Sequence, residues 1–176
     1  MTEQQLVDTF LQSRNERDFH KLYDSYKLPL SRTAIYLCNH DLSIAEDCLQ
    51  EMWVVALNKL AQFEWKSTLK TWLTGILINI IKRRLPKENL SKPLPTDDGI
   101  IQYQPEVLQA IDLKNAISQL PKGYREILVL HDIEGFKHKE IAYLLTISEG
   151  TSKSQLHHAR RAMRNYLRDS KQKIYE

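Results

Sequence analysis

A proline-rich segment divides the sequence into two blocks and limits the folds open to the chain. Four of the six prolines lie from Pro86 to Pro105, among polar and turn-forming residues. No helical spacing of apolar residues continues through this stretch, and its prolines favour a stiff, extended chain. We therefore expect a linker at 87–106 between two domains, at 1–86 and 107–176.

On both sides of this segment, apolar residues recur at intervals of three and four, which is typical of amphipathic helices. In the first block, Asn15 can cap a helix, and Pro29 is expected to begin another. Ser43 and Glu46 have the S-x-x-E spacing of a capping box, which predicts a third helix running to about Leu60.

Further helices are expected on either side of the linker. Ser67 or Thr68 can begin one that ends in three basic residues. Pro121 is expected to open another, capped by Gly135, before a short helix over about 138–145 and a long final helix. Because the first block has no alternating strand pattern, the expected fold class is all-α, with two small helical domains joined by the proline-containing linker.

The helix expected from Ser43 has two dissimilar faces. One face is apolar and consists of Ala45, Cys48, Leu49, Met52, Val55 and Ala56. The opposite face mixes an acid and two amides with two aliphatic side chains: Asp47, Gln50, Val54, Leu57 and Asn58. A protein-binding surface and an additional contact within the domain both explain this mixture, and the pattern leaves both open.

Residues 137–167 have the proportions of a DNA-binding helix-turn-helix. On the final helix, Leu156, Ala159, Met163 and Leu167 share one face. The other side carries short hydrogen-bonding groups near the start and basic groups further along: Thr151, Lys153, Ser154, His157, His158 and Arg161. A recognition helix needs this combination, because the former reach base edges and the latter hold phosphates.

The distribution of charge also indicates a polyanionic partner. The chain carries a net charge of +3, yet residues 150–173 hold seven basic side chains against Asp169 alone, a balance of +6. A basic segment at one end of a chain is typical of nucleic-acid binding, although a solvated basic helix has the same composition.

Other classes of protein are less compatible with the sequence. No stretch is apolar enough to span a bilayer, and the first residues lack a signal-peptide layout, so we expect a cytoplasmic protein without membrane insertion. Cys38 and Cys48 cannot build a closed metal site even with His40, so we expect reduced, buried thiols and no metal or cofactor.

An enzyme is one alternative for the function of the chain. The pairs His40-Asp41 and His131-Asp132 invite comparison with metal-dependent phosphohydrolases, but they lack further ligands at a compatible spacing. We therefore expect no catalytic residues. A response regulator is the alternative among DNA-binding proteins, but it requires an α/β receiver domain, and the first block has no strand pattern.

Several short motifs carry a family resemblance. They are Ala45–Glu51 (AEDCLQE), Thr71-Trp72-Leu73 with Asn79, Leu120-Pro121, Arg125-Glu126, Glu140-Ile141-Ala142 and Gly150-Thr151. In the same order, these segments resemble regions two and four of the extracytoplasmic-function branch of the sigma-70 family. The resemblance implies an RNA polymerase sigma factor, which directs core polymerase to specific promoters and assists promoter opening.

The same resemblance implies partners and residue roles. The polymerase partner would be the clamp helices of the largest subunit, with the flap of the second-largest subunit as a further contact. The residues of this chain that bind core polymerase would be Asp47, Gln50, Glu51 and Val54. Residues for the −10 promoter element would be Phe63, Trp65, Ser67, Asn79, Lys82 and Arg83. Residues for the −35 element would be Thr151, Lys153, Ser154, His157, His158 and Arg161. An anti-sigma factor is the further partner that the resemblance implies.

The chain departs from the family pattern at several positions. Ser152 stands where Val is usual, on the buried side of its helix, and is expected to hydrogen-bond back to a backbone carbonyl. Gln155 replaces a common basic residue. Glu64-Trp65-Lys66 replaces a small, glycine-containing turn, and Trp65 is suited either to stack on a base or to cover the core.

Overall fold

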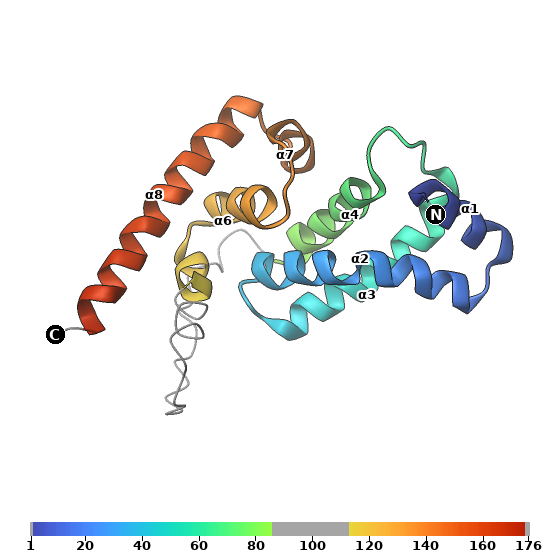
Figure 1. Cartoon of the computed structure of the whole chain (residues 1–176), viewed down its shortest axis with the longest axis horizontal. Helices are drawn as coiled ribbons and strands as arrows, with labels where there is room; N and C mark the ends of the chain where they lie inside the picture. Colours follow the sequence, from blue (N-terminus) through green and yellow to red (C-terminus); the bar gives the residue numbers. More distant parts are fainter. Residues whose placement is uncertain (1, 86–112, 175–176) are drawn as a thin grey trace. The chain divides into compact units, whose positions relative to one another are not determined.

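The structure is a computed structural model that describes residues 2–85 and 113–174, with side chains as far as Arg168. All regular structure within these ranges is helical, which confirms the expected all-α class. The chain divides into two compact units, Met1–Leu85 (unit 1) and Pro86–Glu176 (unit 2), and each is considered by itself (Figure 1). The predicted linker at 87–106 lies outside the described residues.

Unit 1 is a helical bundle whose core lies among its three long helices. Its elements are α1 (Glu3–Ser13), α2 (Glu16–Leu37), α3 (Leu42–Lys59), the 3₁₀ turn η1 (Leu60–Gln62) and α4 (Leu69–Arg84). Helices α2, α3 and α4 pack on one another. Fully buried side chains fill the space between them, including Leu30, Met52, Leu69, Leu73 and Leu77.

Side-chain caps explain where several of these helices begin. Asn15 accepts a hydrogen bond from the backbone N–H of Asp18, as predicted for the start of α2. Thr68 accepts one from the N–H of Thr71 and so begins α4, which decides between the two predicted caps. Each cap satisfies a backbone donor that has no partner within its helix.

The expectation that Pro29 begins a new helix is wrong, because α2 continues through it as one helix of 22 residues. Proline removes one backbone hydrogen bond, and the carbonyl that loses it belongs to Ser25, which is exposed to water. The buried stripe continues on both sides through Tyr26, Leu30 and Ala34. Packing of this stripe therefore overrides the local preference of proline.

The predicted capping box of Ser43 and Glu46 is also wrong. The cap of α3 is Asp41, whose carboxylate accepts a hydrogen bond from the N–H of Ile44 at 3.0 Å. The two preceding residues have left-handed backbones, with φ of 54° at Asn39 and 64° at His40. This reversal places Asp41, an equally good capping residue, two positions ahead of the predicted start.

Unit 2 contains the expected helix-turn-helix. A helical stretch at 113–119 precedes α6 (Lys122–Leu128), which runs into a π-helical turn, η2 (Val129–Ile133). The motif itself consists of α7 (His138–Leu145) and α8 (Glu149–Ile174) (Figure 1). The short helix predicted over 138–145 is confirmed. Gly135, predicted to cap the helix that Pro121 opens, follows the end of η2, where its N–H donates to the His131 carbonyl and its φ of +76° is a conformation that favours glycine.

The position of Pro29 inside α2 leads to a stability prediction. We expect Pro29→Ala to raise the free energy of unfolding of unit 1 by about 1–2 kcal/mol, because the intrinsic helix penalty of proline, about 3 kcal/mol, exceeds its restriction of the unfolded chain, about 1 kcal/mol. Urea unfolding of the full chain followed by tryptophan fluorescence measures unit 1 selectively, since all three tryptophans (Trp53, Trp65, Trp72) lie there.

The matched control is Leu28→Ala. The Leu28 side chain neighbours Pro29 but is 72% exposed, so its removal should change the free energy by no more than about 0.5 kcal/mol. An unchanged or lower unfolding midpoint for Pro29→Ala would show that the ring makes packing contacts worth as much as the missing hydrogen bond.

Candidate protein and nucleic-acid interfaces

The outer face of α3 is open to solvent at two of the four positions that were predicted to bind the polymerase. Gln50 is exposed and Val54 is 60% exposed. Both line a groove of about 680 Å³ between α2 and α3, together with Phe19, Tyr23, Ser31, Ile35, Leu42, Ala45, Glu46, Leu49, Trp53 and Leu57. At these positions, a binding surface therefore fits better than an additional contact within the unit.

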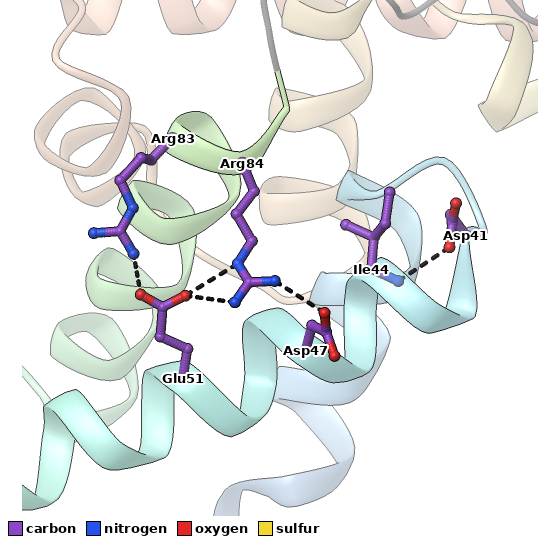
Figure 2. Close-up of polar contacts among 6 residues, drawn as sticks. All are labelled: Asp41, Ile44, Asp47, Glu51, Arg83 and Arg84. Atoms are coloured by element: carbon purple, nitrogen blue, oxygen red, sulfur yellow. Dashed lines mark hydrogen bonds and ion pairs between the residues drawn. The ribbon is translucent and has the colours of Figure 1, made fainter.

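The acidic residues of the same helix are engaged within unit 1. Arg84 at the end of α4 donates from Nε to Glu51 Oε2 at 3.0 Å and from Nη1 to Asp47 Oδ2 at 3.0 Å. Arg83 donates to the other oxygen of the Glu51 carboxylate (Figure 2). Asp47 and Glu51 thus form an acid–arginine network with the basic end of α4, so for these two residues a contact within the unit is part of the explanation.

The network stabilises the charged forms of Glu51 and Arg84. Hydrogen bonds from Arg84 and then Arg83 lower the pKa of the Glu51 carboxyl below its usual range. The hydrogen bond to Glu51, followed by the one to Asp47, raises the pKa of the Arg84 guanidinium. Sequence reasoning did not assign Arg84 any role, because a helix that ends in several basic residues is also what the helix dipole favours.

The residues predicted for the −10 element fall into two groups. Phe63 and Trp65 lie between η1 and α4, with their ring centroids 4.8 Å apart, and Phe63 also contacts Trp72, centroid to centroid, at 5.0 Å. Ser67 is half-buried close by. Asn79 and Lys82 are exposed further along α4, roughly 10–15 Å from Trp72 by helical rise.

Trp65 occupies an unusual backbone conformation. Its φ is +57°, a left-handed value that costs a non-glycine residue about 1–2 kcal/mol. The family resemblance places a glycine-containing turn here, which explains the backbone geometry. The ring is half-buried, so it both covers Phe63 and presents a surface to solvent.

The residues predicted for the −35 element lie on the outer side of α8. Lys153, Ser154, His157, His158 and Arg161 are exposed, and Thr151 is half-buried. On the opposite side, Leu156, Ala159 and Met163 are buried. The predicted division of the helix into an outer polar face and an inner apolar face is therefore confirmed.

Neighbouring elements orient part of this outer face. The ring of Tyr124 on α6 stacks on His158, with centroids 6.0 Å apart and an angle of 18° between the planes. Gln155 is directed toward α6, since a Cβ built on Gly123 would lie 3.3 Å from its Oε1. At position 155, the usual basic residue is thus replaced by a side chain that packs within the unit.

Two other polar residues of α8 are engaged inside unit 2. Arg160 binds Asp132 of η2 through two hydrogen bonds of 2.6 and 2.9 Å, which lower the pKa of the Asp132 carboxyl. Ser152 is fully buried, as predicted. Its hydroxyl hydrogen-bonds with Nδ1 of His138 at 2.9 Å, so its expected partner, a backbone carbonyl, is replaced by a side chain of α7.

Neither a cluster of metal ligands nor a membrane-spanning helix is found among the described residues. Within 2–85 and 113–174, no three His, Cys, Asp or Glu side chains gather where they could share a metal ion. Cys38 and Cys48 are buried free thiols, and burial raises the pKa of Cys38 to about 12. None of the described helices has the length and apolarity needed to cross a bilayer.

Comparison with known proteins gives a consistent result for both units. The family model described as Sigma-70 region 2 matches residues 22–90, and the model described as Sigma-70, region 4 matches residues 110–163. The alternative of a response regulator is wrong, because residues 2–85 contain helices and no strand, whereas a receiver domain is α/β.

Individual relatives are similar over most of the chain. The ECF RNA polymerase sigma factor SigW of Bacillus subtilis is 31% identical over 142 residues, which cover 71% of this chain and 76% of SigW. SigX of the same organism is 26% identical, covering 86% of this chain and 84% of SigX. The sigma factor RpoE of Bartonella quintana, solved with the anti-sigma factor NepR, is 26% identical with a TM-score of 0.65, over 86% of this chain and 98% of RpoE.

The order of the matched regions, the helix-turn-helix in unit 2 and the identity with SigW agree with one another. The chain therefore belongs to the extracytoplasmic-function RNA polymerase sigma factors of the sigma-70 family, which are transcription initiation factors and not enzymes.

Proposed function

We propose that this chain directs core RNA polymerase to specific promoters, with unit 1 binding the polymerase and the −10 element and unit 2 binding the −35 element. The observation that carries the proposal is the outer face of α8, where five exposed polar or basic residues lie opposite a buried apolar stripe. Family membership supplies the polymerase as the partner that this DNA-binding module serves. Such a role also places the chain in the cytoplasm.

In unit 1, the polymerase surface is the outer face of α3, and its proposed target is the clamp helices of the largest subunit. Val54 supplies exposed apolar area and Gln50 supplies an exposed amide, a combination typical of interfaces. Asp47 and Glu51 extend this surface. Because both are already bound to arginines, the polymerase must either bind the network intact or replace the arginines. The flap of the second-largest subunit is proposed as a second contact.

The −10 element is proposed to bind at the rings of Phe63 and Trp65 and along α4. An unpaired base that leaves the duplex regains stacking on a ring such as that of Trp65, which favours strand opening. Ser67 and Asn79 are the hydrogen-bonding groups and Lys82 the phosphate contact. Arg83 can join Lys82 only after Glu51 releases it.

In unit 2, the first half of α8 is proposed to enter the major groove at the −35 element. Thr151, Lys153 and Ser154 lie on its first turns, where side chains of a recognition helix reach base edges. His157 and His158 follow one turn later, and Arg161 is placed for a phosphate. The Thr151 hydroxyl is 2.9 Å from that of Ser148, and the Ser154 hydroxyl donates to the Thr151 carbonyl, so these contacts must be exchanged for DNA.

An anti-sigma factor is proposed as a further partner. The relative RpoE was solved in complex with the anti-sigma factor NepR. In unit 1, the apolar groove between α2 and α3 offers such a protein a surface that overlaps the proposed polymerase contact.

The polymerase surface can be tested at Gln50. We expect Gln50→Ala to weaken binding of the full chain to core polymerase about five- to tenfold, since one interfacial hydrogen bond contributes about 1 kcal/mol. Helicity should be unchanged, because alanine favours α3. The control is Gln12→Ala, which removes an exposed amide from α1 and should leave the affinity unchanged; equal affinities for both variants would contradict the assignment of α3.

The phosphate contact can be tested at Arg161. Removing one cation that neutralises a phosphate lowers the slope of log affinity against log salt by about one, whatever the base sequence. We therefore expect Arg161→Ala to weaken binding to all duplexes and to flatten their salt dependence. Arg17→Ala, at an exposed arginine of α2, is the control; a slope for Arg161→Ala equal to that of the control would refute the phosphate contact.

Base reading and the overall function can be tested together by run-off transcription with core polymerase on a promoter library. The intact chain should initiate at promoters that share two sequence elements. With His158→Ala, we expect preference to fall at one −35 position, where a base contact contributes about 1–3 kcal/mol, and to persist elsewhere. Initiation no better than with core alone would refute the proposed function, whereas equal loss at every −35 position would refute only the role of His158.

A further inference from the structure

A cluster of polar side chains joins η2 and α7 to the first half of α8. Its members are His131, Asp132, His138, Ser152 and Arg160, and we call it the histidine seam. The imidazoles of His131 and His138 are stacked, with centroids 4.6 Å apart and an angle of 30° between their planes. Asp132 binds both His131 Nδ1, at 2.7 Å, and the guanidinium of Arg160.

Ser152 connects the histidine seam to residues 151–154 of α8. We call these residues the reading segment, because Thr151, Lys153 and Ser154 are proposed to contact the −35 element. Ser152 is fully buried, and it lies between Thr151 and Lys153, both proposed to face the −35 element. A buried hydroxyl requires a partner, and here the partner is Nδ1 of His138, the first residue of α7. The bond therefore ties the start of one helix of the motif to the reading segment of the other.

The charge state of His138 restricts the direction of this bond. A neutral imidazole can either accept the Ser152 hydrogen at Nδ1 or donate its own to the Ser152 oxygen. A protonated imidazole can only donate, so the Ser152 oxygen must accept and the hydroxyl hydrogen, which is buried, needs another partner. Protonation also adds a positive charge against the ring of His131 and near Lys153 and Arg160, with Glu149 as the opposing charge.

The surroundings favour the neutral form. Burial, followed by His131 and Lys153, lowers the pKa of His138 below its usual 6.5; Arg160 acts in the same direction and Glu149 against it. Asp132 offers His138 little compensation, because it is already bound to His131 and Arg160. On α7 itself, the carboxylate of Glu140 accepts the backbone N–H of Lys137.

We propose that His138 is a positioning residue for promoter recognition: its neutral imidazole holds the reading segment of α8 through Ser152, and its protonation loosens that segment. The inference rests on the proposed role of α8 at the −35 element. It predicts that discrimination between −35 sequences depends on pH, with His138 as the responsible group.

The direction of this dependence follows from proton linkage. We call the state with the Ser152–His138 bond formed docked, and the state with this bond broken undocked. His138 binds its proton more weakly in the docked state than in the undocked state, where its pKa is near 6.5. The docked state is therefore most stable above about pH 6.5, becomes less stable as the pH falls toward the lowered pKa, and loses no further stability below that pKa. Acid should thus reduce discrimination between −35 sequences.

The first test is nuclear magnetic resonance on the full chain. The ring C–H signals of His138, assigned with His138→Asn, should titrate below pH 6.5, and the backbone amides of 151–154 should shift in the same pH range. In His138→Asn these amides should no longer respond, because the amide group replaces Nδ1 without gaining a charge. His20→Asn, at an exposed histidine of α2, is the control and should retain the response. A His138 signal that titrates at or above 6.5, or the same amide response in His138→Asn, would overturn the inference.

The second test measures discrimination between a duplex selected by this protein from a random library and the same duplex with its −35 element scrambled. For the intact chain, we expect the affinity ratio to fall about tenfold from pH 7.5 to 5.5, the equivalent of one base contact. His138→Asn should keep the ratio within about twofold. Ser152→Ala should have a reduced ratio at pH 7.5 and little further loss in acid, which provides a second variant should His138→Asn fold poorly.

The outcomes separate the two proposals. An intact chain that cannot distinguish the duplexes at pH 7.5 refutes −35 reading by α8, and the amide response in the first test then still decides whether His138 positions the helix. An intact chain that discriminates equally at both pH values refutes the role of His138 alone.

Discussion

The buried stripe of α8 determines where every proposed DNA contact lies. Leu156, Ala159 and Met163 are each less than a tenth exposed, and removing them from water stabilises the helix in one rotational setting. Successive residues are 100° apart on a helix, so a rotation by one position would bury charged side chains and expose this stripe. The apolar core of unit 2 thus fixes which polar residues face outward, and specificity depends on how firmly that setting is held.

In unit 1, a network of ion pairs connects the two proposed surfaces. Asp47 and Glu51 belong to the face proposed for the polymerase, while Arg83 belongs to the basic end of α4 proposed for DNA, and Arg84 joins them. These charges are partly exposed, so water and salt weaken each pair. A network of this kind is strong enough to orient the side chains and weak enough for a partner to replace them. Polymerase that takes up the acids would leave the arginines available for phosphate.

Periodicity and capping residues were sufficient to predict the fold class, the approximate boundaries of α7, the cap Asn15, Thr68 as one of two candidate caps, and the outer face of α8. It failed where a tertiary contact or a chain reversal overrides a local preference, as in the unbroken α2 at Pro29 and the cap at Asp41. The candidate site was predictable as a set of positions, since family motifs fix these along the chain. Its pairings were not, because Arg84 with Glu51 and Ser152 with His138 are each far apart in sequence.

Two of the departures from the family pattern, at Trp65 and Ser152, have a common physical basis. Trp65 lies in a turn that contains glycine in the family pattern, and its left-handed backbone costs about 1–2 kcal/mol. Its ring contact with Phe63 offsets about 0.5–1.5 kcal/mol of that. At Ser152, a hydroxyl replaces the expected Val, and the imidazole of His138 satisfies it. Each unusual residue is therefore tolerated through one specific neighbour, and both lie in segments proposed to contact promoter DNA. Such pairs make the geometry of a recognition surface depend on a contact beneath it, so the promoter preference of this chain cannot be transferred from relatives that lack the pair.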